Sequence, residues 1–289
     1  MQAVKIGIIG GSGLYAMPDL ENLQEHRIET PFGFPSDLIM TGLLNNIPVA
    51  FLARHGQDHH LLPSEVPYQA NIYAFKQLGV GYLLSFSAVG SLQKAIKPLD
   101  MLLPDQYLDL TRQRPSTFMG NGVVGHVSMA DPVCTALSAI LAKAVNSLDD
   151  PPVLHQGGTY LCIEGPQFST RVESCWYRSL GASVVGMTNM PEARLAREAQ
   201  IAYASLAMVT DYDSWNPDEA GVTAEMAIAN LRCNAERATL IAREAIRLID
   251  QKLPVSSAHR ALEQGLVTPL DKLTPDKRAL VELLLKKDE

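Results

Sequence analysis

Four short, mostly apolar runs constrain the fold of this chain more than any other feature of its sequence. They are Val4–Ile9, Tyr82–Phe86, Ser183–Met187 and Ile201–Val209. Each has the length of one strand, and apolar residues at consecutive positions predict strands that are buried on both faces. Helical patterns lie between these runs. This alternation predicts an α/β fold in which helices flank a central β-sheet.

An early hairpin makes the predicted sheet mixed rather than purely parallel. Asn45-Asn46 separates two strand patterns, Leu38–Leu44 and Ile47–Ala53, and is typical of a two-residue hairpin turn. Helix signals occur at five places, which are Pro67 to Leu78, Asp131 to about Asn146, Thr170 to Gly181, Glu192–Ala199, and about Asp218 to Gln251. Gly79 is the expected C-cap of the first helix, and Thr170 forms a capping box with Glu173 at the start of the third.

The chain is expected to form one domain over residues 1–251, although its 289 residues could hold two. Residues 252–289 have the character of a helical C-terminal extension. Pro254 and Ser256-Ser257 interrupt the helical pattern there, and Thr274-Pro275 starts a new helix. We expect this extension to pack on its own domain or on a neighbouring subunit.

Composition excludes several classes of function. A net charge of −7 without blocks of lysine or arginine argues against a nucleic-acid-binding surface. No apolar run approaches the ~20 residues that span a membrane. The 4 cysteines form no C-x-x-C pair, which indicates neither a zinc site nor a disulfide framework. The first residues lack a secretory signal pattern, so a cytoplasmic protein is expected.

Polar or glycine-rich residues follow five of the predicted strands. These segments are Gly10–Gly13, Arg54-His55, Ser87–Ser91, Met187–Asn189 and Thr210–Asp213. Ligands of open α/β sheets bind at the carboxyl ends of the strands. The five segments are therefore expected to converge on one site.

The first segment has three interpretations. Gly11–Ala16 fits the dinucleotide pattern G-x-G-x-x-A, but Pro18 interrupts the helix that should follow, and the next strand end offers no acid for a ribose. The loop could instead bind one phosphate through backbone N–H groups and the Ser12 hydroxyl, or it could be a tight turn alone.

Two charged or titratable residues favour the phosphate interpretation. Arg54 offers a fixed set of donors and His55 an imidazole, and the hydroxyls of Ser87 and Ser91 would complete a site for a tetrahedral oxyanion. A metal cluster of His55, His59 and His60 is the alternative. It is disfavoured because the segment precedes a Pro-Ser turn and has no helical register to align ligands.

Asp211 and Asp213 follow the apolar run Ile201–Val209 at alternate positions, so strand geometry would place both carboxylates on one side. Two carboxylates in a partly dry site repel each other. The pKa of one should rise, and that group could act as a general acid at neutral pH. Taken alone, the pair could also be turn-forming aspartates.

Eight motifs occur in the order found in one known family. They are Gly10–Gly13, Thr30–Gly33, Arg54–Gly56, Tyr68–Asn71, Ser87–Ser91, Glu164–Arg171, Met187–Glu192 and Thr210–Asp213. Over about residues 3–250 the chain resembles the trimeric purine nucleoside phosphorylases, and among them the branch that acts on 5′-methylthioadenosine. The resemblance implies that phosphate displaces a purine from C1′ of a nucleoside, which gives the free base and a sugar 1-phosphate.

The resemblance also implies a role for individual residues. A small positive pocket would bind phosphate through Ser12, Arg54, His55, Ser87 and the Ala88 backbone. The nucleoside would contact Phe168, Ser169, Met187, Thr188, Asp211, Asp213, Ala224, Ala227 and Ile228. Asp211 would hydrogen-bond or protonate purine N7, Asp213 would hold the 6-amino group, and His55 would complete the catalytic set. His126 would reach the 5′ substituent from a neighbouring subunit.

A few of these positions indicate the substrate. Relatives that act on 6-oxopurines usually have Asn in place of Asp211 and Glu in place of Ser169, so adenine is the expected base. Small residues at Ala224, Ala227 and Ile228 suit a methylthio group. The alternative is a phosphorylase of 6-oxopurine nucleosides or of methylthioinosine, and a dinucleotide-binding protein is more distant. The family implies a homotrimer, no cofactor or metal, and no nucleic-acid or membrane partner.

Overall fold

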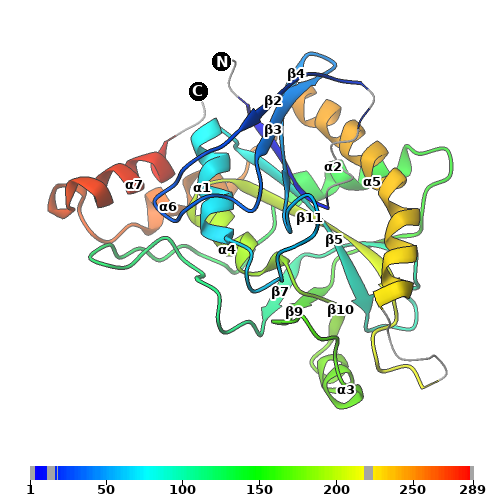
Figure 1. Ribbon diagram of the computed structural model, residues 1–289. Coiled ribbons are helices and arrows are strands. Elements are labelled where there is room, and N and C mark those ends of the chain that lie inside the picture. The colour runs from blue at the N-terminus through cyan, green and yellow to red at the C-terminus, as the bar shows by residue number, and fades with distance from the viewer. Residues whose placement is uncertain (1–3, 12–16, 18, 218–223, 287–289) are drawn as a thin grey trace.

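The computed structural model describes residues 4–11, 17, 19–217 and 224–286, without the side chains of residues 224–229, 231 and 232. Within these residues 11 strands form a mixed sheet, and helices flank it on both faces (Figure 1). The predicted α/β class and the mixed sheet are therefore confirmed.

The strands follow one another along most of the chain. They are β1 (Ile6–Gly10), β2 (Leu20–His26), β3 (Ile39–Leu44), β4 (Ile47–Ala53), β5 (Tyr82–Ser91), β6 (Met101–Leu103), β7 (Gln106–Asp109), β8 (Leu154–Gln156), β9 (Thr159–Cys162), β10 (Ala182–Gly186) and β11 (Ala202–Asp211). The order in the sheet is β2-β3-β4-β1-β5-β10-β9-β7. Beside this path β11 pairs with β5 and β6, and β6 pairs with β8.

The sheet branches at β5, and this branching creates the edge at which a ligand can bind. β5 runs parallel to β1 and β11, and β1 also runs parallel to β4. At Gly90 and Ser91, β5 instead pairs antiparallel with β10. The carboxyl ends of β1, β4, β5 and β11 therefore meet at one edge, and the end of β10 lies beside them.

Helices cover the two faces of the sheet with separate apolar cores. They are α1 (Tyr68–Leu78), α2 (Thr135–Asn146), α3 (Arg171–Ser179), α4 (Asn189–Glu198), α5 (Ala224–Gln251), α6 (Ala261–Gly265) and α7 (Pro275–Leu285). Ile72 of α1 and Leu195 of α4 belong to one core, which α6 and α7 extend. Leu137 of α2 and Ile246 of α5 belong to the other. α1, α2, α4 and α5 thus bury their apolar sides in the cores beside the sheet.

Local signals in the sequence were reliable where backbone chemistry decides the structure. The hairpin turn is confirmed, because Asn45 and Asn46 have positive φ angles of 51° and 66° between β3 and β4. Gly79 ends α1 in the left-handed conformation with φ 92°. The capping box of α3 is also present, with Thr170 and Glu173 bonded to each other's backbone N–H.

Other expectations were wrong. Ser87–Ser91 does not form a loop after a strand; it is the last part of β5. α2 begins at Thr135, four residues after the expected Asp131. Three strands were not predicted from the sequence. They are β2, whose residues are mostly exposed and polar, and the short strands β6 and β7. The expected start of the last helix at Asp218 lies outside the described residues.

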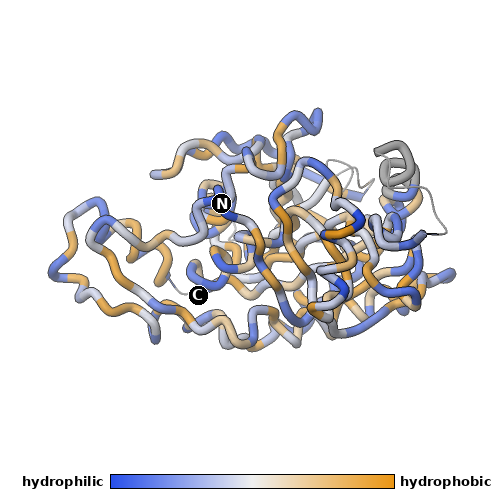
Figure 2. The backbone as a smooth tube through the Cα atoms, turned by 90° about the horizontal axis from the view of Figure 1, so that it is seen from below, coloured by the Kyte–Doolittle hydropathy of each residue, from blue (hydrophilic) through white to orange (hydrophobic). Residues whose placement is uncertain are grey.

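Residues 252–286 form a lobe together with an arm of the chain at residues 111–131. Gly125 of the arm pairs with Leu266, and Phe118 shares an apolar core with Leu262 and Leu280. The lobe, which contains α6 and α7, projects from the body of the protein (Figures 1 and 2). In the part of the chain that the structure describes, no helix combines the length and hydrophobicity of a membrane span.

Candidate active site

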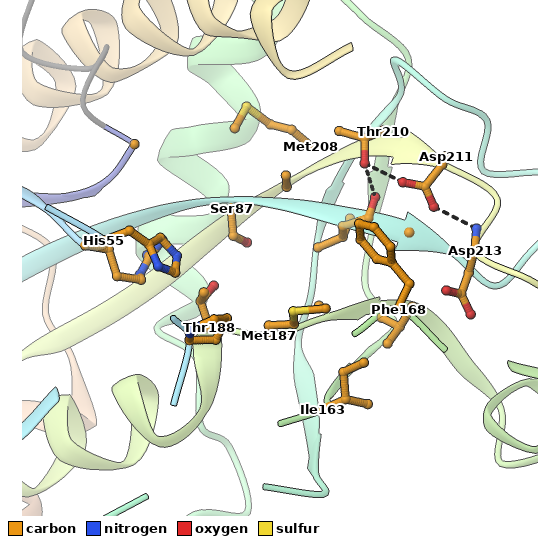
Figure 3. Close-up of a pocket in the computed structure, with 18 of the residues that line it drawn as sticks. His55, Ser87, Ile163, Phe168, Met187, Thr188, Met208, Thr210, Asp211 and Asp213 are labelled. Atoms are coloured by element: carbon orange, nitrogen blue, oxygen red, sulfur yellow. Dashed lines mark hydrogen bonds between the residues drawn. The ribbon is translucent and has the colours of Figure 1, made fainter. Parts of the chain in front are cut away.

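A cavity of about 280 Å³ opens at the carboxyl edge of the sheet (Figure 3). His55, Ser87 and Thr188 lie at one end, Asp211 lies at the other, and Met187 lies between them. The lining consists of Gly11, Arg54, His55, His59, Pro63, Phe86, Ser87, Ala88, Val89, Gly90, Ile163, Phe168, Ser169, Val185, Gly186, Met187, Thr188, Met208, Thr210, Asp211 and Asp213. The cavity therefore has a basic end and an acidic end.

Arg54, which follows β4, is held by Glu192 beneath the basic end. Arg54 is 2% exposed, and its guanidinium donates from Nε to Glu192 Oε2 at 2.7 Å and from Nη2 to Oε1 at 3.1 Å. Nη2 also donates to Ser85 Oγ at 2.7 Å, and Nη1 donates to the carbonyl of Phe86 at 3.1 Å. Burial disfavours the charged form, but attraction to Glu192 outweighs this effect and raises the pKa of Arg54.

Glu192 changes what Arg54 can offer a ligand. Among the described residues, one of the two Nη1 hydrogens of Arg54 has no acceptor. The positive charge itself is already compensated by the carboxylate. Arg54 therefore presents one rigidly held donor to an anion.

His55 is neutral at physiological pH. Its Nδ1 lies 2.9 Å from the carbonyl of Leu61, and its ring stacks on His59 with centroids 4.4 Å apart. Burial, followed by the nearby charge of Arg54, lowers the pKa of His55 to about 4. Because a carbonyl can only accept, Nδ1 carries the proton and Nε2 is an acceptor. Among the described residues, the side chains at the basic end thus carry no uncompensated positive charge.

Four buried polar atoms that line the cavity have no hydrogen-bond partner among the described residues. They are Ser87 Oγ, Ser169 Oγ, Thr188 Oγ1 and Asp213 Oδ2, in residues that are 5%, 8%, 7% and 7% exposed. Leaving such a group unpaired costs roughly 1–3 kcal/mol. A ligand with polar groups at both ends of the cavity would satisfy them.

The two acidic residues adopt a geometry that strand alternation does not explain. β11 ends at Asp211, and Asp213 follows in a left-handed turn with φ 51°. The carboxylate of Asp211 accepts from Thr210 Oγ1 at 2.7 Å and from the Asp213 backbone N–H at 2.8 Å. These two bonds fix the orientation of Asp211 and bring the second carboxylate to the same end of the cavity (Figure 3).

Gly90 makes room for this pair. A Cβ atom at Gly90 would lie 2.9 Å from Asp211 Oδ1 and 3.1 Å from Asp213 Cβ. Any other residue would displace the acidic pair, so β5 must carry glycine where it turns away from β11 toward β10.

Apolar side chains form the wall between the two ends. Phe168 is partly exposed at the mouth of the cavity, with Ile163 and Met187 nearby (Figure 3). Gly165, with φ 67°, passes so close to Met187 that a Cβ there would lie 2.5 Å from its Sδ. A flat apolar group could be held against this wall, with its polar edge toward the acidic pair.

The cavity brings together most of the residues selected from the sequence. Arg54, His55, Ser87, Ala88, Phe168, Ser169, Met187, Thr188, Asp211 and Asp213 all line it. Ser12 and the side chains of Ala224, Ala227 and Ile228 lie outside what the structure describes. Ser91 does not line the cavity, and its Oγ donates to the carbonyl of Gln93 at 2.9 Å.

His126 lies elsewhere, on the arm. Its backbone N–H donates to Gly265 O in the C-terminal extension at 2.8 Å, and its side chain is exposed. The alternative metal cluster is not supported either. Within the described ranges, no group of three or more His, Cys, Asp or Glu side chains is arranged to hold a metal ion.

Glu192 was missed from the sequence because it lies 138 residues from Arg54 and carries no local signal. The only available hint was its place in the motif Met187–Glu192, directly after a predicted strand end.

Comparison with known proteins gives consistent similarities. Residues 5–247 match the model of the phosphorylase superfamily. The S-methyl-5′-thioadenosine phosphorylase of Thermosynechococcus vestitus is 56% identical over 284 residues, which cover 98% of each chain. The crystal structure of a methylthioadenosine phosphorylase from an Antarctic soil metagenomic library aligns with TM-score 0.95 and 55% identity, and covers 99% of this chain and 100% of that one. An adenosine/methylthioadenosine phosphorylase of Schistosoma mansoni, solved with methylthioadenosine as its S12T mutant, aligns with TM-score 0.82 and 35% identity, covering 90% and 96%.

Proposed function

The chain belongs to the phosphorylase superfamily, and from this premise we propose that it cleaves 5′-methylthioadenosine with phosphate, giving adenine and 5-methylthioribose 1-phosphate. The observation that carries the proposal is the set of unpartnered atoms in one cavity. Ser87 Oγ lies at the basic end, and Ser169 Oγ and Asp213 Oδ2 lie where a purine would be held. A phosphate and a nucleoside together would satisfy both groups.

Phosphate would bind at the end formed by Arg54, His55 and Ser87. The remaining Nη1–H of Arg54, the Ser87 hydroxyl and the Ala88 backbone N–H would donate to phosphate oxygens. Because neutral His55 offers Nε2 as an acceptor, monohydrogen phosphate would place its own O–H there. We propose that Ser12 adds a further hydroxyl. The site would bind the dianion mainly through oriented donors, since the charge of Arg54 is shared with Glu192.

The bond from C1′ to the purine would break through a state in which positive charge develops on the ribose. A phosphate held beneath C1′ stabilises this charge and is already placed as the nucleophile. The bonding electrons leave with the purine, and Asp211 in its protonated form would stabilise the departing base by sharing or giving that proton at N7. Such general-acid help is worth roughly 10²–10⁴ in rate. Phosphate is a co-substrate, and this chemistry needs no metal or organic cofactor.

Adenine preference would come from the acidic end. Asp213 Oδ2 is an unused acceptor that suits the 6-amino group, whereas a 6-oxo group would place a second acceptor against it. Ser169 offers a hydroxyl that can donate to N1 of adenine. Phe168 would pack against the base, and Met187 would lie against the ribose. Ala224, Ala227 and Ile228 are proposed to hold the 5′-methylthio group.

We further propose a homotrimer in which His126 of one subunit reaches the 5′ group of its neighbour's substrate. Its exposed position on the arm supports this role. Release of a purine and a sulfur-containing sugar phosphate would place the enzyme in purine and methionine salvage. Each of the four cysteines is a free thiol, which accords with a cytoplasmic location.

Release of free base tests the proposal. The purified protein is incubated with methylthioadenosine, adenosine, inosine and methylthioinosine, each with and without phosphate. We expect phosphate-dependent release that is fastest with methylthioadenosine. Equal release without phosphate would refute phosphorolysis, and faster release from inosine or methylthioinosine would refute the assignment of the base.

A further inference from the structure

Arg114 is a buried cation beside the cavity that has no part in the steps above. It lies in the segment between β7 and α2, and the residue is only 7% exposed. It does not line the cavity. Burying a guanidinium is costly unless its donors are satisfied, so its contacts indicate what the residue does.

Those contacts join two loops that carry ligand-facing residues. Nη2 donates to the carbonyl of Glu164 at 2.7 Å and that of Ile163 at 3.3 Å, in the loop after β9. Nη1 donates to the carbonyls of Met187 at 2.6 Å and Met190 at 2.8 Å, after β10. One guanidinium therefore ties the end of β9 to the end of β10.

Glu164 holds Arg114 in this position. Its Oε1 accepts from Arg114 Nε at 2.8 Å, and its Oε2 accepts from the backbone N–H groups of Arg112 and Gln113 at 2.7 and 3.1 Å. Burial would raise the pKa of Glu164, but these hydrogen bonds outweigh it and lower the pKa, so the carboxylate stays charged. Tyr68 adds its hydroxyl at 3.0 Å from Nη1.

The tied loops form the nucleoside side of the cavity. Phe168 and Ser169 lie on the same loop as Glu164, beyond Gly165–Gln167, and Met187 and Thr188 lie on the other loop. The loops pass in close contact at Gly165, so a shift of one would displace the other. The basic end depends on a different buried pair, Arg54 and Glu192, which shares no hydrogen bond with Arg114.

We propose that Arg114, locked by Glu164, is a positioning residue that sets the geometry of the nucleoside half of the site more than that of the phosphate half. The identity of the ligands rests on the proposed function. The clamp, by which we mean the Arg114 guanidinium bonded to the loops after β9 and β10, rests on the contacts above. A displacement of about 1 Å at such a site can cost about 10²-fold in activity.

The experiment compares R114M and E164Q with R112M as a matched control, because Arg112 lies in the same segment, has an exposed side chain and contributes only its backbone to the clamp. Calorimetry measures Kd for adenine and, separately, for inorganic phosphate. We expect R114M to weaken adenine binding by roughly 10–100-fold and phosphate binding by less than about threefold. E164Q should shift adenine binding in the same direction, and R112M should match the wild-type protein.

Hydrogen exchange in the ligand-free proteins provides a readout that needs no substrate. R114M and E164Q should speed exchange in residues 163–169 and 186–190 but not in residues 84–91. E164Q keeps the fold testable if R114M unfolds, since Glu164 is only partly buried.

The inference would be overturned if E164Q matched R112M in both adenine binding and exchange, or if adenine and phosphate binding weakened to the same extent. A wild-type protein that neither binds adenine nor releases it would refute the proposed function instead. The exchange comparison would still decide whether Arg114 positions the two loops.

Discussion

Arg54 and Glu192 form a two-point ion pair in the interior, 2.7 Å from Nε to Oε2 and 3.1 Å from Nη2 to Oε1. The carboxylate also accepts from Ser85 Oγ at 2.7 Å and from the Tyr203 hydroxyl at 2.8 Å. All four contacts are made beneath the basic end of the cavity. The pair therefore links the stability of the fold to the placement of one phosphate donor.

Replacing Glu192 by Gln should strongly destabilise the protein. The substitution leaves Arg54 charged and uncompensated in the interior, and losing one partner of a buried pair costs about 3–5 kcal/mol. Urea unfolding would measure this loss. Tyr203→Phe is the control, because it removes one hydrogen bond to the same carboxylate and should cost about 1 kcal/mol. Similar losses for both variants would mean that the ion pair contributes little.

Stability should depend on pH through His55. Its pKa is about 4 in the folded protein and 6.5 in the unfolded chain, so between these values the unfolded state binds more protons. The free energy of unfolding from this group should rise with pH from 4 to 6.5, by at most roughly 3 kcal/mol. The contribution is complete above pH 6.5 and is lost as the pH falls toward 4.

Urea unfolding at pH 4.5 and pH 7 would detect this dependence. His55→Gln should reduce the difference between the two pH values, whereas the exposed His126→Gln should leave it unchanged. An undiminished difference in His55→Gln would show that other groups produce the pH dependence.

Gly90→Ala should impair catalysis more than phosphate binding. The new Cβ would collide with Asp211 Oδ1 and Asp213 Cβ, and a displacement of about 1 Å predicts a loss in kcat/KM of roughly 10²-fold. Gly42→Ala is a crowded control far from the cavity, since its Cβ would meet Glu21 O and Leu20 at 3.0 Å. That variant should lose stability but keep its kcat/KM. Unchanged kinetics in Gly90→Ala would argue against a role of the acidic pair.

Asp213→Asn should weaken the preference for an amino group on the base. An amide can present a donor where the carboxylate offers only acceptors, so a 6-oxo group is no longer opposed. The ratio of kcat/KM for methylthioadenosine to that for methylthioinosine should fall by roughly 5–150-fold, which corresponds to about 1–3 kcal/mol. Steady-state kinetics with the two nucleosides would show this. A constant ratio would place base selection elsewhere, with Ser169 as the next residue to test.

Sequence patterns were sufficient to predict those parts of the fold that depend on local chemistry. The bounds of β4, Ile47–Ala53, are those predicted, because a strongly apolar run follows a two-residue asparagine turn. β2 could not be predicted in the same way. Its side chains are mostly exposed and polar, so pairing with β3 stabilises a strand that its own residues do not favour.

The sequence was sufficient to predict many of the residues that line the candidate site. It was not sufficient to predict which residues compensate the charges of its buried arginines. Parallel strands bring their carboxyl ends to one edge, which explains why Arg54, Ser87 and Asp211 line one cavity. The compensation of Arg54 depends on Glu192, 138 positions away, and the clamp of Arg114 depends on residues that are 46–76 positions away. Tertiary contacts of this kind leave no local pattern in a single sequence.

The fate of phosphate shows directly whether the protein cleaves its substrate by phosphorolysis or by hydrolysis. The protein is incubated with methylthioadenosine and inorganic phosphate, adenine is quantified, and phosphorus NMR follows the phosphate. Phosphorolysis predicts one new sugar 1-phosphate signal whose amount equals the adenine released, with inorganic phosphate consumed to the same extent. Adenine released with no phosphate ester formed would show hydrolysis, and would contradict a cavity built to use phosphate as the nucleophile.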